Sequence, residues 1–139
     1  MTDDQLRALR AVPLFRGFSD RALKKVLEIS KEVSHPDGKN VLEEDASAVG
    51  FHMILDGNAE ISVDGKVVGT FGPGEYFGEM SLIDGKPRSA TVTAENGLRT
   101  LSIPAWNFDR VMLEHPEMMR AMLEVLCARV RRLEGSPRS

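Results

Sequence analysis

Helical spacing of hydrophobic residues opens this chain and then gives way to a strand pattern. Hydrophobic residues recur at steps of three and four over residues 3–11 and 20–31, which predicts two helices, the second with Ser19 as its N-cap. From residue 32 to 103, alternating or β-branched runs separated by pairs such as Asp56-Gly57 and Asn96-Gly97 predict about seven or eight short strands. Residues 61–68, with Asp-Gly at their centre, predict a hairpin with a type I′ turn.

Helical spacing returns towards the C-terminus. Pro104 suits the first turn of a helix, and helices are predicted over 105–114 and 117–133, interrupted at His115-Pro116. Together the elements predict a mainly β fold, an antiparallel β-roll resembling a jelly roll, with N-terminal and C-terminal helices. A length of 139 residues and a hydrophobic content of 42% suffice for one compact domain.

The last predicted helix is apolar on two faces. One stripe, at alternating steps of four and three, contains Met119, Leu123, Leu126, Val130 and Leu133, and the adjacent stripe contains Met118, Met122 and Val125. A helix with two apolar faces needs two partners. We therefore expect one stripe to pack on the roll and the other to pair with a second copy of the chain; the alternative is one wide face that packs on the roll alone.

Charge and composition exclude several functions. A net charge of −3 and a pI of about 5.6 argue against a nucleic-acid surface, and the single basic cluster, residues 129–132, is interpreted as a solvated helix end. One cysteine, Cys127, forms no intrachain disulfide and is typical of a reducing compartment. No signal peptide is expected, and no apolar run approaches the roughly 20 residues that span a bilayer, so no membrane association and a cytoplasmic location are expected.

No metal or catalytic centre is expected. His35, His52 and His115 fall in three different predicted elements, so they do not form a metal site, and His52 is expected on an outward strand face or as a hydrogen-bonded residue. Serine and cysteine nucleophile patterns are absent. Glu75 and Glu79 flank a glycine turn and do not have the opposed arrangement of a glycosidase. The chain is therefore not expected to be an enzyme.

Residues 74–92, GEYFGEMSLIDGKPRSATV, carry the most specific chemistry. Gly78 leaves room for a ligand to approach the amides of a short helical turn over 79–82. Arg88, which follows Pro87, can offer two parallel donors to a phosphate, and Glu79 can accept hydrogen bonds from hydroxyls. These groups predict a receptor for a small phosphorylated ribose.

The order of these residues resembles the phosphate-binding cassette of cyclic-nucleotide-binding domains, such as those of catabolite activator protein and of the protein kinase A regulatory subunit. The resemblance covers about residues 9–133, with a departure at Glu44, where many relatives have glycine. It implies a β-roll closed by a C-terminal lid or dimer helix. The implied organisation is one domain over 1–139, with N-terminal helices 1–31, roll 32–103 including cassette 74–92, helices 104–133 and tail 134–139.

The resemblance also implies the ligand-binding residues, which are Phe77, Gly78, Glu79, Met80, Ser81, Arg88, Ser89 and Ala90. Arg88 would pair with the exocyclic phosphate oxygens, and Glu79 would bind the ribose 2′-hydroxyl. Backbone amides around Met80, Ser81 and Ser89 would complete the pocket. Leu133 and Glu134 would lie near the base, over which Leu133 would form an apolar cap.

The implied function is that of a sensor or regulatory module that binds a cyclic nucleotide without metal and signals to an unknown effector through movement of helix 117–133. Ser89 favours cAMP over cGMP, because cGMP-preferring relatives often have threonine there. The expected partners are the nucleotide and a second copy of the chain through helix 117–133, and not nucleic acid. Two alternatives remain open: a ligand-free interaction domain of the same fold, and the sensor fragment of a larger transcription factor or enzyme.

Overall fold

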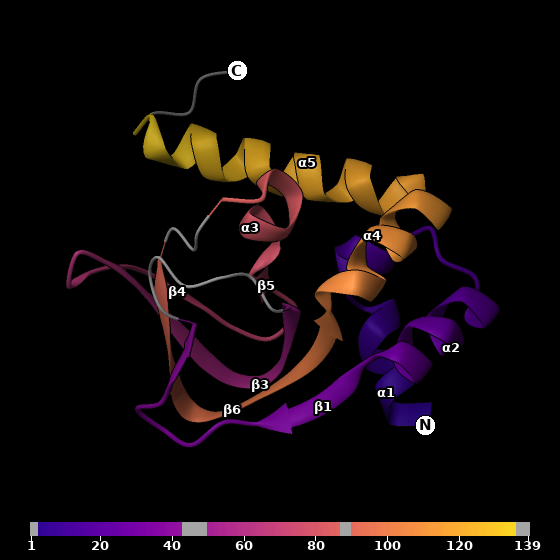
Figure 1. The fold of residues 1–139 in the computed structure, drawn as a ribbon, viewed down its shortest axis with the longest axis horizontal. Coiled ribbons are helices and arrows are strands. Elements are labelled where there is room, and N and C mark those ends of the chain that lie inside the picture. Colours follow the sequence, from indigo (N-terminus) through magenta and orange to yellow (C-terminus); the bar gives the residue numbers. More distant parts are fainter. Residues whose placement is uncertain (1–2, 43–49, 87–89, 136–139) are drawn as a thin grey trace.

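The computed structural model describes residues 3–42, 50–86 and 90–135. Its elements, in chain order, are α1 (Asp3–Arg10), η1 (Pro13–Phe15), α2 (Asp20–Ile29), β1 (Lys31–Ser34), β2 (Asn40–Leu42), β3 (Gly50–Val63), β4 (Lys66–Phe71), β5 (Tyr76–Phe77), α3 (Glu79–Asp84), β6 (Thr91–Pro104), α4 (Ala105–Glu114) and α5 (Pro116–Leu133) (Figure 1). The predicted N-cap is confirmed, because the Ser19 hydroxyl accepts a hydrogen bond of 3.1 Å from the amide of Ala22.

The strands form one antiparallel sheet in the order β1-β6-β3-β4, with β2 also paired to β6 and β5 also paired to β3. Within the described residues β1 and β4 end this path, so the sheet is curled but not closed. The expected mainly β fold with flanking helices is confirmed. The hairpin over 61–68 is confirmed as well, since Asp64 and Gly65 both have positive φ angles, as a type I′ turn requires.

The expected number of strands is wrong. The described residues contain six strands, and two of them, β3 and β6, are each 14 residues long. Asp56-Gly57 and Asn96-Gly97 were expected to separate strands, but they form kinks within β3 and β6, where the register shifts. Gly57 has a φ of 79°, and a Cβ there would lie 2.6 Å from the amide nitrogen of Leu98. The close approach of the two long strands therefore requires glycine at this kink.

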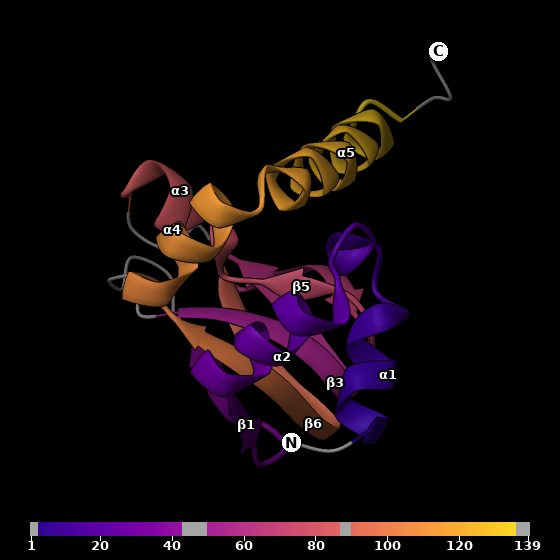
Figure 2. The same ribbon diagram turned by 90° about the vertical axis from the view of Figure 1, so that its right-hand side faces the viewer.

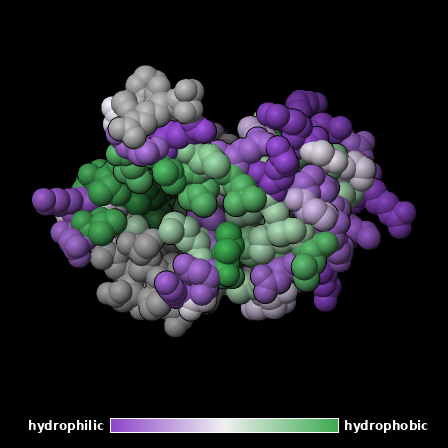
Figure 3. Space-filling model, turned by 90° about the horizontal axis from the view of Figure 1, so that it is seen from above, coloured by the Kyte–Doolittle hydropathy of each residue, from purple (hydrophilic) through white to green (hydrophobic). Residues whose placement is uncertain are grey.

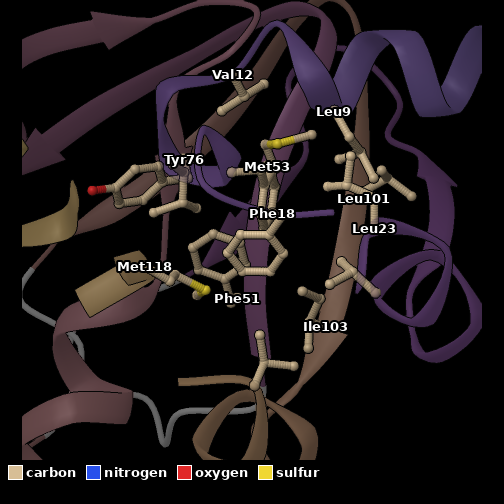
Figure 4. Packing of buried hydrophobic residues seen from close by; sticks show 14 of the residues in the cluster. Leu9, Val12, Phe18, Leu23, Phe51, Met53, Tyr76, Leu101, Ile103 and Met118 are labelled. Atoms are coloured by element: carbon tan, nitrogen blue, oxygen red, sulfur yellow. The ribbon is translucent and has the colours of Figure 1, made fainter. Parts of the chain in front are cut away.

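Hydrophobic side chains alternate between the two faces of the sheet. Phe51 and Met53 of β3, with Leu101 and Ile103 of β6, pack against the helices in one large cluster (Figure 4). A second cluster, inside the roll, contains Ile54, Ala59, Phe77, Val92, Ala94 and Leu98. The curl of the sheet thus divides the core into a helix-covered part and an inner part.

Helix α5 lies beside α3, with which it lines a groove, and its C-terminal end projects away from the roll (Figures 1 and 2). Its two apolar stripes differ in burial: Met118 and Met122 are buried, whereas every member of the other stripe is exposed. The exposed stripe consists of Met119, Leu123, Leu126, Val130 and Leu133. One stripe therefore packs on the protein, whereas the side chains of the other remain exposed in the single chain.

Candidate ligand site

The cassette region begins where β5 passes into α3. Tyr76 and Phe77 are buried, Gly78 turns the backbone with a φ of 92°, and Glu79 opens the helix. The predicted helical turn is present and extends to Asp84. Because Gly78 adopts a left-handed conformation that other residues rarely tolerate, it directs Glu79 back towards the protein.

Glu79 is the most buried carboxylate among the described residues, with 8% of its surface exposed. A buried charge requires compensation from charged or polar neighbours. Arg129 of α5 supplies part of it, with its guanidinium 3.8 Å from Glu79 Oε1. This distance is that of a charge–charge contact and exceeds a hydrogen bond.

Arg129 makes three further contacts with the roll. Its guanidinium donates a hydrogen bond of 3.4 Å to the Tyr76 carbonyl oxygen and lies over the rings of Phe71 and Tyr76, 4.7 and 5.5 Å from their centroids. Cation–π contacts of this kind typically contribute about 0.5–1 kcal/mol each at partly exposed sites. Arg129 therefore ties the C-terminal half of α5 to the cassette.

The interpretation of residues 129–132 as a solvated helix end is wrong for Arg129. Arg131 and Arg132 are exposed, but the Arg129 side chain is only 24% exposed. Its spacing contained the signal: Arg129 lies seven residues after Met122 and eleven after Met118, which places it on the inner stripe of the helix. Composition alone grouped it with its exposed neighbours.

The burial of this region changes the pKa of Tyr76. The pKa of its hydroxyl is raised to about 12, mainly by burial and secondarily by the nearby charge of Glu79, while Arg129 acts in the opposite direction. The neutral phenol is therefore maintained throughout the physiological pH range.

Helices α3 and α5 also enclose an apolar groove of about 280 Å³. Figure 3 shows hydrophobic side chains gathered around a hollow on the face that carries α5. The groove is lined by Tyr76, Glu79, Met80, Ile83, Met112, Met119, Met122, Leu123, Leu126 and Arg129. Its polar groups are concentrated at the end where Arg129 meets Glu79.

The structure brings together part of the predicted site. Phe77, Gly78, Glu79 and Met80 follow one another at the start of α3, and the backbone of Ser81 lies in the same helix. Ala90 is half-buried directly before β6.

The remaining predicted site residues fall in two other places. Arg88 and Ser89 lie outside the described residues. Leu133 and Glu134 are at the end of α5, where Leu133 is 87% exposed, so the apolar cap expected over the base is not packed on the roll here. Arg129, one turn earlier, contacts the cassette residue Glu79.

His52 is hydrogen-bonded, as one expectation had it, but it does not face outward. Its ring lies on Phe77, with 5.1 Å between centroids, and its Nδ1 is 2.8 Å from the Ser102 hydroxyl. Within the described ranges, no three histidine, cysteine or acidic residues are grouped closely enough to hold a metal ion. The same ranges contain no helix with the length and hydrophobicity to cross a membrane.

Comparisons with known proteins agree with this geometry. Residues 32–115 match the family model of the cyclic nucleotide-binding domain. The cAMP-dependent protein kinase regulatory subunit of Aspergillus fumigatus is 29% identical over 115 residues, which are 81% of this chain and 28% of that protein. A solved structure described as Sp-2Cl-cAMPS bound to PKAR CBD2 has a TM-score of 0.78 at 26% identity, over 98% of this chain and 95% of that one. The Thermus thermophilus catabolite activator protein has a TM-score of 0.77 at 24% identity, over 88% and 60% of the two chains.

The chain belongs to the cyclic nucleotide-binding domain family. The predicted resemblance to cyclic-nucleotide-binding domains is therefore confirmed, and the fold is shared with catabolite activator protein. The chain spans less than a third of the length of the Aspergillus relative.

Proposed function

We propose that this chain is a sensor module that binds cAMP in preference to cGMP and signals through displacement of α5, without catalysing a reaction. The contact between Arg129 of α5 and Glu79 of the cassette carries this proposal. The contact joins Glu79, which is assigned to the ribose 2′-hydroxyl, to α5, whose displacement is the proposed signal.

The coupling follows from the electrostatics of Glu79. A ribose hydroxyl that donates to this buried carboxylate changes the attraction between Glu79 and Arg129, because both partners act on the same charge. A ligand shifts a conformational equilibrium only by its differential affinity for the two states. The Arg129–Glu79 contact provides that difference between helix positions.

The phosphate is assigned to Arg88 and to amides around Met80, Ser81 and Ser89, with Phe77, Gly78 and Ala90 shaping the pocket. This assignment rests on the family cassette and on relatives whose descriptions name cAMP or its analogue. The preference for cAMP rests on Ser89.

The exposed stripe of α5 supports a homodimer. Five apolar side chains spaced by four and three residues form a coiled-coil seam, and on this helix they are between 38% and 87% exposed. An 18-residue helix supplies only a short seam, so the dimer is weak. Sedimentation equilibrium of the wild type and of Leu126→Asp tests it; a concentration-dependent dimer that the substitution abolishes is the expected result, and a wild type that stays monomeric at high concentration rejects the dimer.

Isothermal titration with cAMP and with cGMP tests ligand binding. Arg88→Ala is the test variant, and Lys86→Ala, which removes a neighbouring exposed cation, is the matched control. The lost charge pair costs about 2–5 kcal/mol, so Arg88→Ala weakens cAMP binding at least about 30-fold and Lys86→Ala leaves it nearly unchanged. Absence of heat from both nucleotides in folded protein would reject the sensor function and favour the ligand-free interaction domain.

A further inference from the structure

A chain of four polar side chains runs through the roll and ends beside the cassette. His35 Nε2 lies 2.9 Å from the Thr100 hydroxyl, which lies 3.3 Å from the Ser102 hydroxyl, and that hydroxyl lies 2.8 Å from His52 Nδ1. Thr100 is fully buried and His35 is 8% exposed. Burial of such groups is unfavourable unless they are hydrogen-bonded, so the chain has a defined geometry. We refer to these four residues as the histidine relay.

When all three hydrogen bonds form together, the histidine relay has two possible proton orders, because each hydroxyl carries one hydrogen. In the first order His35 donates through Nε2, Thr100 donates to Ser102, and Ser102 donates to His52 Nδ1. In the second order every bond is reversed, and His35 carries its proton on Nδ1.

The surroundings of His35 select the first order. His35 Nδ1 is buried and has no hydrogen-bond partner. A buried N–H without an acceptor is rarer and costs more than an unused acceptor, so the proton stays on Nε2. Burial, and secondarily the charge of Lys39, lowers the pKa of His35, which also favours the neutral ring. His52 Nδ1 is therefore held as an acceptor.

The orientation of His52 bears on the cassette. His52 is paired with Phe77 in the β3–β5 ladder, and the two rings are stacked at 18°. Strand β5 has only two residues, and Phe77 directly precedes Gly78 and α3. The hydrogen bond from Ser102 thus fixes the rotation of the His52 ring, and this ring packs against Phe77 just before α3 begins.

We propose that His52 is a positioning residue for the cassette, whose ring the histidine relay fixes against Phe77 so that Glu79 is presented for binding. This inference rests on the proposed function. It assigns to residues outside the ligand pocket a share of the nucleotide affinity.

Two substitutions separate the parts of this arrangement. Ser102→Ala removes the bond to Nδ1 and leaves the ring stacking in place, whereas Thr100→Val removes the central hydroxyl at nearly constant shape. Thr100→Ser is the matched control, because it retains the hydroxyl. Affinity for cAMP is measured by titration under conditions in which urea unfolding shows every variant to be folded.

We expect Ser102→Ala and Thr100→Val to weaken cAMP binding about three- to tenfold, as for loss of one hydrogen bond, and Thr100→Ser to bind nearly as the wild type does. Imidazole nitrogen NMR of wild-type protein is expected to show His52 with Nδ1 unprotonated, and both relay-breaking variants are expected to populate the other tautomer. Should Thr100→Val fail to fold, Ser102→Ala alone decides, since Ser102 is only half-buried.

Unchanged cAMP affinity in Ser102→Ala would overturn the inference, even with a changed His52 tautomer. If the wild type binds no nucleotide, the proposed function fails separately, and the ligand-free spectrum becomes the test. Ser102→Ala is then expected to shift the amide signals of Gly78 and Glu79, whereas unshifted signals would overturn the positioning role itself.

Discussion

Substitution of Arg129 by glutamine tests the link between α5 and the cassette most directly. Two unit charges 3.8 Å apart attract by about 4 kcal/mol at an effective dielectric constant of about 20, which is an upper bound. The Arg129 side chain is 24% exposed and that of Glu79 is 10% exposed, so desolvation of Glu79 and screening of Arg129 both reduce the net value. We expect a coupling free energy of about 1 kcal/mol between the two side chains.

The single substitution costs more than this coupling. Arg129→Gln also loses the donor to the Tyr76 carbonyl and the contacts with the rings of Phe71 and Tyr76. Together these losses lower the free energy of unfolding by about 2 kcal/mol. Arg132→Gln removes the same charge from an exposed position in the same helix and is expected to change it by less than about 0.5 kcal/mol.

Urea unfolding of the wild type, Arg129→Gln, Glu79→Gln and the double variant isolates the pair through a double-mutant cycle. The cycle removes the contributions that each side chain makes to third groups. A coupling below about 0.3 kcal/mol would refute the reasoning, because the 3.8 Å contact would then contribute nothing to the position of α5.

Three further predictions concern ionisation and backbone geometry. Because the pKa of His35 is lowered in the folded protein, the unfolded chain binds the proton first as the pH falls, and wild-type stability decreases below about pH 6.5. Urea unfolding at pH 8 and at pH 5.5 measures this loss of stability, which should be smaller in His35→Gln. Tyr76 is the single tyrosine, so the tyrosinate absorbance should titrate near pH 12 in folded protein and near pH 10 in urea. Stability should then be lost as the pH rises from about 10, because the unfolded chain loses the proton first. A titration midpoint near pH 10 in folded protein would contradict the burial of Tyr76. Gly57→Ala should lower the free energy of unfolding in urea by more than about 3 kcal/mol, because the new Cβ would clash with the backbone of Leu98. Gly65→Ala is the control, since Gly65 has a similar φ but open space around it, and should lower the free energy by about 1 kcal/mol. Equal losses in the two variants would show that the clash with Leu98 is unimportant.

Local patterns predicted those features that neighbouring residues decide among themselves. The Ser19 cap and the hairpin over 61–68 depend on hydrogen bonds and φ angles within a few residues, and both are present. The cassette was recognisable because its glycines and the acid lie within one short segment. Its start, from Phe77 to Met80, has the predicted order and helical turn.

Asp56-Gly57 and Asn96-Gly97 show where local patterns mislead. Such dipeptides can form either a tight turn between two strands or a kink within one long strand. Which of the two forms depends on whether a neighbouring strand pairs with the residues on both sides of the dipeptide. Here β3 and β6 pair along nearly their whole length, so both dipeptides stay inside the ladder. The pairing strand lies about 40 residues away in the chain, beyond the reach of any local pattern.

The sequence by itself determined the fold family, the order of the helical and strand regions and the segment that holds the candidate ligand site, because periodicity and short motifs record local conformational preferences. Only the tertiary structure decided that Arg129 turns from a basic helix end towards Glu79, and that His35, Thr100, Ser102 and His52 form one relay. Most of these contacts join residues 50 to 65 positions apart, and one joins two residues of the same strand. The side chains meet only after the sheet has curled and α5 has packed beside α3. Their energies depend on burial, which is a property of the packed molecule and not of any single segment.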